Sequence, residues 1–307
     1  MNTRVPSEAL PINPLPGEAS STANPPEGTD EIDASWVRHC SQIQPDSKIL
    51  LGRYVATHKI EYGNRLLIGS GTTLNYLMDE TIERQVTTGV PLDLSITSTN
   101  MHVIERGSDA KSKYVDLLLN TQLSLTGGRL QIGLRSLVGE FAVAGVKSTL
   151  FHPDLVVFGA IGVFVGDQGE LDITYQFEEE LPVQVSFGSR ATDHRILLFD
   201  HSKLGRRGGW KADITVETLL RNTQECSLIT TIPTDDDPRY PVWKQQIAAF
   251  QKLLENLAKE EKFSGKELRL ILVRDHNEEA EIISLSDFRD QKPGAGTING
   301  KHLPRRK

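Results

Sequence analysis

Between residues 45 and 232 the chain alternates between short apolar runs and longer stretches in which apolar residues stand three or four positions apart. Short apolar runs bounded by turns are typical of strands buried on both faces, and the wider spacing is typical of helices with one apolar face. The runs that predict strands are Leu66–Ile68, Leu92–Ile96, Leu123–Thr126, Leu155–Ile161, Arg195–Phe199 and Leu228–Thr231. Strands that alternate with helices predict an α/β, Rossmann-like, doubly wound fold with a mainly parallel sheet.

Helices are predicted in the stretches between these runs. The segments with helical spacing or a helix-start signal are Pro45–His58, Leu74–Ile82, Met101–Glu105, Leu137–Val146 and Phe177–Ala191. The last segment contains Pro182 and Gly188, which are poor helix formers.

The pattern changes after residue 232, and we expect residues 233–290 to form a C-terminal α+β extension. Asp235–Pro238 reads as a turn, and an amphipathic helix follows it. Its apolar face is Trp243, Ile247, Phe250, Leu254 and Leu257. Leu268–Val273 and Glu281–Leu285 then predict a hairpin.

Both ends of the chain are predicted to be loose. Six of the fifteen prolines precede residue 27, so residues 1–30 cannot bury enough apolar surface to offset the entropy of ordering, and we expect a disordered Pro-rich tail. Residues 291–307 are rich in glycine and basic residues, which predicts a flexible basic tail. Residues 31–232 remain as the main domain.

Composition narrows the classes of function. With 38% hydrophobic residues the chain can build a core, and its net charge of −7 argues against a whole-chain binder of nucleic acid. The cysteines, Cys40 and Cys226, are too few and too far apart for a disulfide framework or a zinc site, so we expect free thiols and no metal or cofactor. Without a signal peptide or an apolar run that could span a bilayer, a cytoplasmic protein is expected.

One candidate for chemistry is Gly69-Ser70-Gly71-Thr72-Thr73, between an apolar run and a helix. Such a turn can aim backbone N–H groups and hydroxyls at one point, and the helix N-terminus adds partial positive charge, which suits a phosphate. A tight strand-to-helix connection explains the same residues about equally well. No Gly-Lys-Ser/Thr follows, so the turn is not a Walker loop.

A second candidate is Asp200-His201-Ser202-Lys203-Leu204-Gly205-Arg206-Arg207, directly after a predicted buried strand. Ligands of open α/β sheets bind beyond the carboxyl ends of the strands, where Lys203 could meet an anion. The alternative is a solvated basic loop.

Taken together, these segments resemble the C-terminal effector domain of DeoR-type transcriptional regulators. This domain belongs to the larger superfamily of ribose-5-phosphate isomerases, glucosamine-6-phosphate deaminases and CoA transferases. The matching segments follow the family's order over about 185 residues. They are Leu67–Thr73, Thr97–Asn100, Leu125–Gly128, Phe158–Val163, Leu197–Arg206 and Leu228–Thr230.

The resemblance implies a pocket for a phosphorylated sugar or a similar metabolite. The residues expected to form it are Ser70, Gly71, Thr72, Thr73, Asn100, Gly127, Gly128, Gly159, Ala160 and Lys203. Asn100 could instead be a helix cap, and the glycine pairs could serve tight packing.

The chain also departs from the family. Gly69 stands where the family often has Asp, and Glu178-Glu179-Glu180 aligns with the family's Glu-rich helix start only after a small shift. One of these three glutamates is expected to face the pocket, although a run of glutamates is usually a solvated helix turn. The winged helix-turn-helix that precedes the sensor in DeoR-type regulators does not fit the Pro-rich residues before position 45, so no direct DNA binding is expected.

Two functions remain from these observations. The first is a binding module that senses a phosphorylated sugar, forms a homo-oligomer and acts through a protein partner, with no membrane contact. The second is an isomerase- or deaminase-type enzyme, which needs a carboxylate as a base. The related isomerases carry acidic residues after the strand that matches Leu155–Ile161, and this chain has none until Asp167, which favours the binder. Glu178, Glu179 and Asp200 are the candidate bases.

Overall fold

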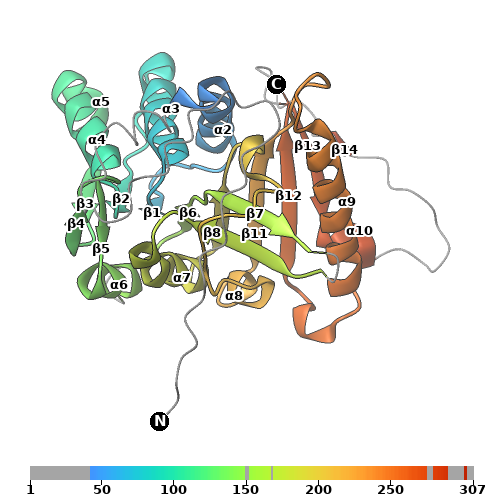
Figure 1. Ribbon diagram of the computed structural model, residues 1–307. Helices are drawn as coiled ribbons and strands as arrows, with labels where there is room; N and C mark the ends of the chain where they lie inside the picture. Colours follow the sequence, from blue (N-terminus) through green and yellow to red (C-terminus); the bar gives the residue numbers. More distant parts are fainter. Residues whose placement is uncertain (1–41, 149–151, 167–168, 275–278, 290–300, 303–307) are drawn as a thin grey trace, which may run out of the picture.

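The computed structural model describes residues 42–148, 152–166, 169–274, 279–289 and 301–302 (Figure 1). Within them, nine strands form one central sheet. In spatial order these are β14 (Lys301–His302), β13 (Ala280–Ser284), β12 (Glu267–Val273), β11 (Glu225–Thr231), β9 (His194–Leu198), β6 (Leu155–Phe158), β1 (Arg65–Ile68), β2 (Ser95–Ser98) and β3 (Gln122–Leu125). The strands from β12 to β3 all pair in parallel, which confirms the predicted α/β, Rossmann-like fold with a mainly parallel sheet.

Helices connect the strands and cover both faces of the sheet (Figure 1). The helices of the described residues are α2 (Pro45–His58), α3 (Thr72–Thr88), α4 (Met101–Lys113), α5 (Val115–Leu118), α6 (Glu140–Lys147), α7 (Leu181–Ser189), α8 (Val216–Leu220), α9 (Tyr240–Leu257) and α10 (Leu285–Arg289). Three short 3₁₀ segments complete them: η1 (Glu178–Glu180), η2 (His201–Lys203) and η3 (Glu261–Phe263).

The core has two halves, one on each face of the sheet. Because side chains alternate along a strand, Leu66 and Ile68 pack against α2, α3 and α4, and Leu67 packs on the face covered by α6, α7, α8 and α9. The neighbouring strands alternate in the same way, since Val157 and Val156 of β6 belong to opposite halves, as do Ile196 and Leu197 of β9. Strands buried on both faces explain why the sequence shows them as continuous apolar runs.

Three predicted boundaries are wrong. The strand predicted at Leu92–Ile96 is Ser95–Ser98, because Asp93, with a φ of 49°, interrupts extended backbone. Leu137 lies in strand β5 (Ser136–Val138) rather than in a helix, and α6 begins only at Glu140, after Gly139 with a φ of 88°.

The third wrong boundary concerns Leu155–Ile161, which is not one strand. Strand β6 ends at Phe158, and β7 (Gly162–Val165) starts a second, three-stranded antiparallel sheet with β8 (Leu171–Tyr175) and β10 (Trp210–Lys211). The remaining strand, β4 (Arg129–Gln131), pairs with β5 in a hairpin. The sequence pattern did not predict β4, β5, β8 or β10.

The C-terminal extension continues the main sheet. Strand β12 pairs in parallel with β11 along its whole length, and the predicted hairpin is confirmed by the antiparallel pairing of β12 with β13. Helix α9 packs as predicted, since Trp243, Phe250 and Leu254 are buried and Ile247 packs against the same core. The hairpin turn at residues 275–278 lies outside the described residues.

The predicted N-terminal tail, Cys40, Asp167 and most of the predicted C-terminal tail also lie outside the described residues. Of the C-terminal tail, only Lys301 and His302 are described, as β14. Cys226 is a buried free thiol. Among the described helices, none combines the length and the apolar character needed to cross a bilayer.

Candidate functional site

The carboxyl ends of the parallel strands lie along one edge of the central sheet, and the direction of winding reverses between β1 and β6. From β1 the chain adds β2 and β3 on one side, and β6, β9, β11 and β12 follow on the other. Ligands of doubly wound sheets bind in the crevice outside the strand ends at such a switch point. Ser70 follows β1 and Gly159 follows β6, so two of the predicted site residues stand at this point.

The turn from β1 to α3 leaves the first turn of that helix without a side-chain cap. Gly71 is the N-cap residue, and its φ of 136° is one that residues with a side chain rarely adopt. No acidic residue lies in the first turn of α3. The positive end of the helix dipole and the N–H groups of the first turn therefore face no carboxylate of their own helix, and such an end suits an anion.

Ser70 joins this turn to the start of α7. Its side chain is buried, and its hydroxyl donates to Glu180 Oε1 at 3.2 Å. The Ser70 hydroxyl oxygen in turn accepts a hydrogen bond from Gln184 Nε2 at 2.8 Å. Both partners are buried as well, so a carboxyl and an amide lie beside the helix N-terminus in a site of low polarity.

Glu180 is the glutamate of the run that turns inward, whereas Glu178 and Glu179 are exposed. Burial raises the pKa of Glu180 from 4.5 to about 7, against the opposing effect of the hydrogen bond from Ser70. Burial also raises the pKa of Tyr175 well above its ordinary value, and the charge of Glu180 adds to this. Glu179 instead forms an ion pair with Arg129 at 2.8 Å.

Asn100 follows β2 and caps α4, because its side-chain oxygen accepts from the backbone N–H of His102 at 3.0 Å. Its amide nitrogen donates to Asn75 Oδ1 at 2.9 Å and reaches the carbonyl of Gly71 at 3.5 Å. The cap and the contact with the β1–α3 turn are therefore both present, and they fix the position of the turn from the side of β2.

The predicted glycines differ in how tightly they pack. A side chain at Gly128 would come within 2.8 Å of Ala142 Cβ, whereas Gly127 has open space around it. At Gly159 a Cβ would lie 3.3 Å from the carbonyl oxygen of Ser70, so β6 approaches the turn closely there. Ala160 is partly buried and packs against the core.

Gly69, a position where the chain departs from the predicted family pattern, lies close to two aromatic side chains. A Cβ on Gly69 would lie 3.0 Å from Phe158 Cβ and 3.6 Å from the ring of Phe187. The space that a larger side chain would need is filled by these two aromatic residues.

The Asp200–Lys203 segment forms η2 at the end of β9. Asp200 is fully buried, and its Oδ1 accepts from the backbone N–H of Ser202 at 3.1 Å and from the Ser202 hydroxyl. His201 lies between Thr231, at 2.8 Å, and Asp237, at 3.2 Å. Lys203 is half-buried, and its side chain makes no hydrogen bond or ion pair within the described part of the chain.

Several buried polar atoms near the strand ends have no hydrogen-bond partner among the described residues. They are Thr99 Oγ1, Tyr175 Oη, Gln184 Oε1, Asp200 Oδ2 and Thr230 Oγ1. Buried polar atoms are usually satisfied by protein, water or a ligand. Thr99 and Asp200 follow β2 and β9, and Thr230 lies in β11, so the carboxyl side of the central sheet offers polar groups that a hydroxylated ligand could use. Gln184 lies in α7, and Tyr175 ends β8 of the small sheet.

Sequence reasoning missed three residues of this arrangement, Asn75, Tyr175 and Gln184, and for Glu180 it left open which glutamate of the run faces inward. The signal for Glu180 was its place directly before the Leu181-Pro182 helix start, but the sequence does not show which glutamate turns inward. In the described part of the chain, no cluster of three or more His, Cys, Asp or Glu side chains could hold a metal ion.

No protein-family model matches the chain, and no curated protein matches it either. Among solved structures, ribose 5-phosphate isomerase from Plasmodium falciparum is 12% identical with a TM-score of 0.33, over 51% of this chain and 52% of that one. The ribose 5-phosphate isomerase of Methanocaldococcus jannaschii is 14% identical with a TM-score of 0.34, over 52% and 54%. The eIF2B beta protein of Chaetomium thermophilum is 12% identical with a TM-score of 0.32, over 52% and 43%.

The chain thus spans about half the length of these neighbours. At this level of similarity the matches carry no argument about activity, ligand or partner. A DeoR-type regulator is not among these three, and the resemblance to that family stays a prediction from the motifs.

Proposed function

We propose that the chain binds a small phosphorylated ligand, a sugar phosphate or a related metabolite, at the carboxyl edge of its sheet. The phosphate lies at the N-terminus of α3 on Ser70, Gly71, Thr72 and Thr73, and Lys203 supplies a positive charge from the η2 segment. The chain then acts as a DeoR-like sensor, as a homo-oligomer and through a protein partner rather than through direct contact with DNA.

The observation that carries the proposal is the uncapped start of α3 beside the buried Ser70. The Ser70 hydroxyl lies just before this helix start, and those of Thr72 and Thr73 lie within its first turn, which holds no carboxylate. Such a start favours a phosphate over a neutral group. Lys203, which makes no ion pair within the described residues, is free to meet an anion.

The sugar part of the ligand would extend along the strand ends. Asn100, Gly127 and Gly128 line the β2–β3 side, and Gly159 and Ala160 form the floor at β6. Support comes from the buried oxygens of Thr99, Gln184 and Asp200 that lack a partner in the described structure, because hydroxyl groups of a sugar can donate to such atoms.

A thermal-shift screen with phosphorylated sugars and their unphosphorylated forms tests the proposal. Ligand at about a hundred times Kd should add roughly 2.7 kcal/mol of stability, and only the phosphorylated form should do so. Lys203→Ala should weaken binding by about 1.5–3 kcal/mol, because it removes a charge-assisted contact. The control is Lys252→Ala on α9, an exposed lysine far along the chain from the proposed site, which should leave binding unchanged. Equal stabilisation by both sugar forms would refute the phosphate site.

One observation favours an enzyme as the second candidate. The raised pKa of Glu180, about 7, suits a group that gives and takes a proton near neutral pH, as an isomerase- or deaminase-type reaction requires. Among the acidic candidates, Glu178 and Glu179 are exposed and Asp200 caps η2, which makes Glu180 the better placed base.

The two candidates are separated by following the bound sugar phosphate by NMR during incubation with the protein. A sensor returns the ligand unchanged. An enzyme converts it, and conversion should be lost in Glu180→Gln and retained in Glu178→Gln, the matched control on the exposed side of the same 3₁₀ segment. Turnover that survives Glu180→Gln would exclude this residue as the base.

A further inference from the structure

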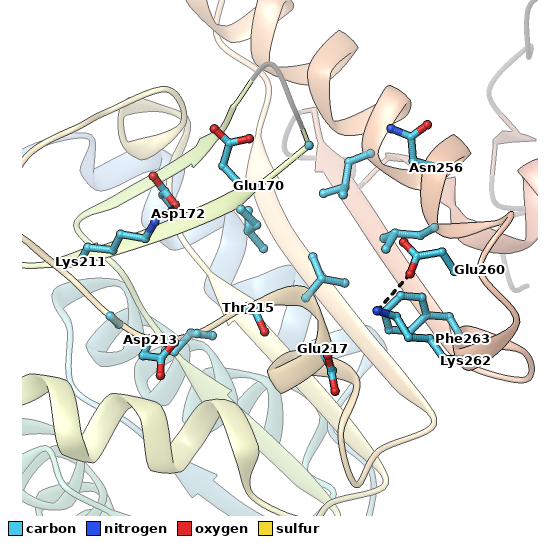
Figure 2. A pocket seen from close by; sticks show the side chains of 17 residues that line it. Glu170, Asp172, Lys211, Asp213, Thr215, Glu217, Asn256, Glu260, Lys262 and Phe263 are labelled. Carbon is cyan, nitrogen blue, oxygen red and sulfur yellow. Dashed lines mark ion pairs between the residues drawn. The ribbon is translucent and has the colours of Figure 1, made fainter.

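A recess of about 630 Å³ lies between the small sheet and helix α9 (Figure 2). One wall comes from β8, from β10 with the loop after it, and from α8, and the other wall comes from α9 and η3. None of the residues at the carboxyl edge described above lines it. Its volume lies within the range of about 300–1,000 Å³ that is typical of binding pockets.

The floor of this recess, here called the α9 pocket, is apolar. The large apolar side chains that line it are Leu171, Ile214, Val216, Leu253, Leu257 and Phe263. Figure 2 shows Phe263 beside Lys262 and Glu260 on one side of the recess, with further charged side chains such as Asp172 and Lys211 on the other. A floor of this kind accepts aliphatic groups, since each one removed from water stabilises the complex.

The charges around the floor are mainly negative. The lining holds five carboxylates and two lysines, and both lysines are already paired, Lys211 with Asp172 at 2.5 Å and Lys262 with Glu260 at 3.0 Å. That leaves three carboxylates without a lysine, those of Glu170, Asp213 and Glu217.

These three carboxylates are poorly compensated within the described residues. Glu170 and Asp213 make no ion pair there, and Glu217 meets only Arg221, at 3.9 Å between two exposed side chains. In Figure 2 they stand on different sides of the apolar floor. Negative charges spaced around an apolar centre match a chain that carries several cations beside aliphatic residues.

We propose that the α9 pocket docks a peptide segment of a partner protein, in which aliphatic residues are flanked by lysines or arginines. The aliphatic side chains fill the floor, and the cations reach Glu170, Asp213 and Glu217. The negative lining disfavours phosphorylated metabolites and nucleic acids here, so this site and the proposed phosphate site take ligands of opposite charge.

The test begins with a random-peptide display library selected on the immobilised full-length protein. The expected result is enrichment of peptides that combine Leu, Ile or Val with Lys or Arg. An enriched peptide, labelled with fluorescein, is then titrated with the protein and followed by fluorescence anisotropy. Its affinity should fall as salt is added, because exposed charges are screened.

Charge reversal locates the binding site. Glu170→Lys with Asp213→Lys should weaken binding about tenfold or more, because attraction turns into repulsion at two points of the rim. Both residues are exposed, so the fold should persist. The matched control is Glu255→Lys, an exposed charge reversal on α9 outside the pocket lining, which should leave the affinity unchanged.

Selection of peptides without basic residues, no enrichment at all, or equal binding by the double variant would each overturn the proposal. A further variant tests whether peptide binding is independent of the proposed phosphate site. Thr72→Asp, which changes the start of α3, should leave peptide binding unchanged, since Thr72 does not line the α9 pocket.

Discussion

Two effects act on the pKa of Glu180 in opposite directions. Burial raises this pKa and the hydrogen bond from Ser70 lowers it, and burial has the larger effect. The folded protein therefore holds a proton on this carboxyl between about pH 4.5 and 7, where the unfolded chain has released it. The folded state binds more protons in that window, so its stability is complete below the window and falls as the pH rises through it. Across this window the free energy of unfolding falls by about 3 kcal/mol, because each unit of pKa difference between the folded and unfolded states corresponds to about 1.4 kcal/mol.

Glu180→Gln should abolish this decline, because an amide does not ionise and can still accept from Ser70. We expect the variant to match the wild type in melting temperature at pH 5 and to exceed it at pH 8. Glu178→Gln, at an exposed position, should follow the wild type at both values. A wild-type protein whose stability stays flat from pH 5 to pH 8 would show that Glu180 titrates normally.

At single residues, the sequence predicted local structure where the backbone conformation requires glycine. The Gly-Ser-Gly-Thr-Thr turn needs glycine at position 71 because of its φ, and the sequence identified that turn. The choice among Glu178, Glu179 and Glu180 depends on how η1 enters α7, which no local pattern specifies. The packing of Phe158 and Phe187 against Gly69 could not be read from the sequence for the same reason.

At the scale of elements, helices α9 and α6 each carry a phenylalanine, one buried and the other exposed. Phe250 is 2% exposed in the core beneath α9, whereas Phe141 on α6 is 81% exposed. Phe250→Ala should cost about 3–5 kcal/mol of unfolding free energy, because a cavity adds to the lost burial. Phe141→Ala should change it by less than about 0.5 kcal/mol. Urea denaturation measures both, and similar losses would mean that α9 does not pack as described.

The same two residues show when the spacing of apolar residues predicts the buried face of a helix. The spacing on α9 predicted its buried face, because a long helix on a sheet repeats its contacts every three to four residues. On the short helix α6, Ala142 and Val146 take the inner face and Phe141 points away from it. Strands β8 and β10 escaped detection because neither shows a long apolar run, and β8 carries Tyr175 toward Glu180.

For the whole molecule, we expect the C-terminal elements to unfold together with the sheet, because they pair with it and share its core. Removing residues 233–307 would leave β11 without the partner it pairs with along its length and would uncover the core beneath α9. We expect a chain of residues 1–232 to aggregate or to lose its cooperative thermal transition, as measured by circular dichroism and light scattering. A monomeric fragment that melts as sharply as the full chain would show that the extension is dispensable.

The sequence predicted the mainly parallel sheet, because few folds are compatible with apolar runs that alternate with helical segments. The α9 pocket did not follow, because it forms between β8, the loop after β10 and α9, which are far apart in the sequence. Strand β8 lines this pocket with Leu171 and approaches Glu180 with Tyr175, and its place in the fold came only from the structure.

The central claim is that the N-terminus of α3 holds the phosphate, and a matched pair of variants at Thr72 tests it most directly. Thr72→Asp places a negative charge in the first turn, a position where Asp stabilises helices, so the fold should persist while the phosphate is repelled. Thr72→Asn has nearly the same shape without the charge. Calorimetric titration with the phosphorylated sugar should show binding by the wild type and by Thr72→Asn, and a loss of about tenfold or more in Thr72→Asp. Equal affinity of Thr72→Asp and Thr72→Asn for the phosphorylated sugar would contradict the account.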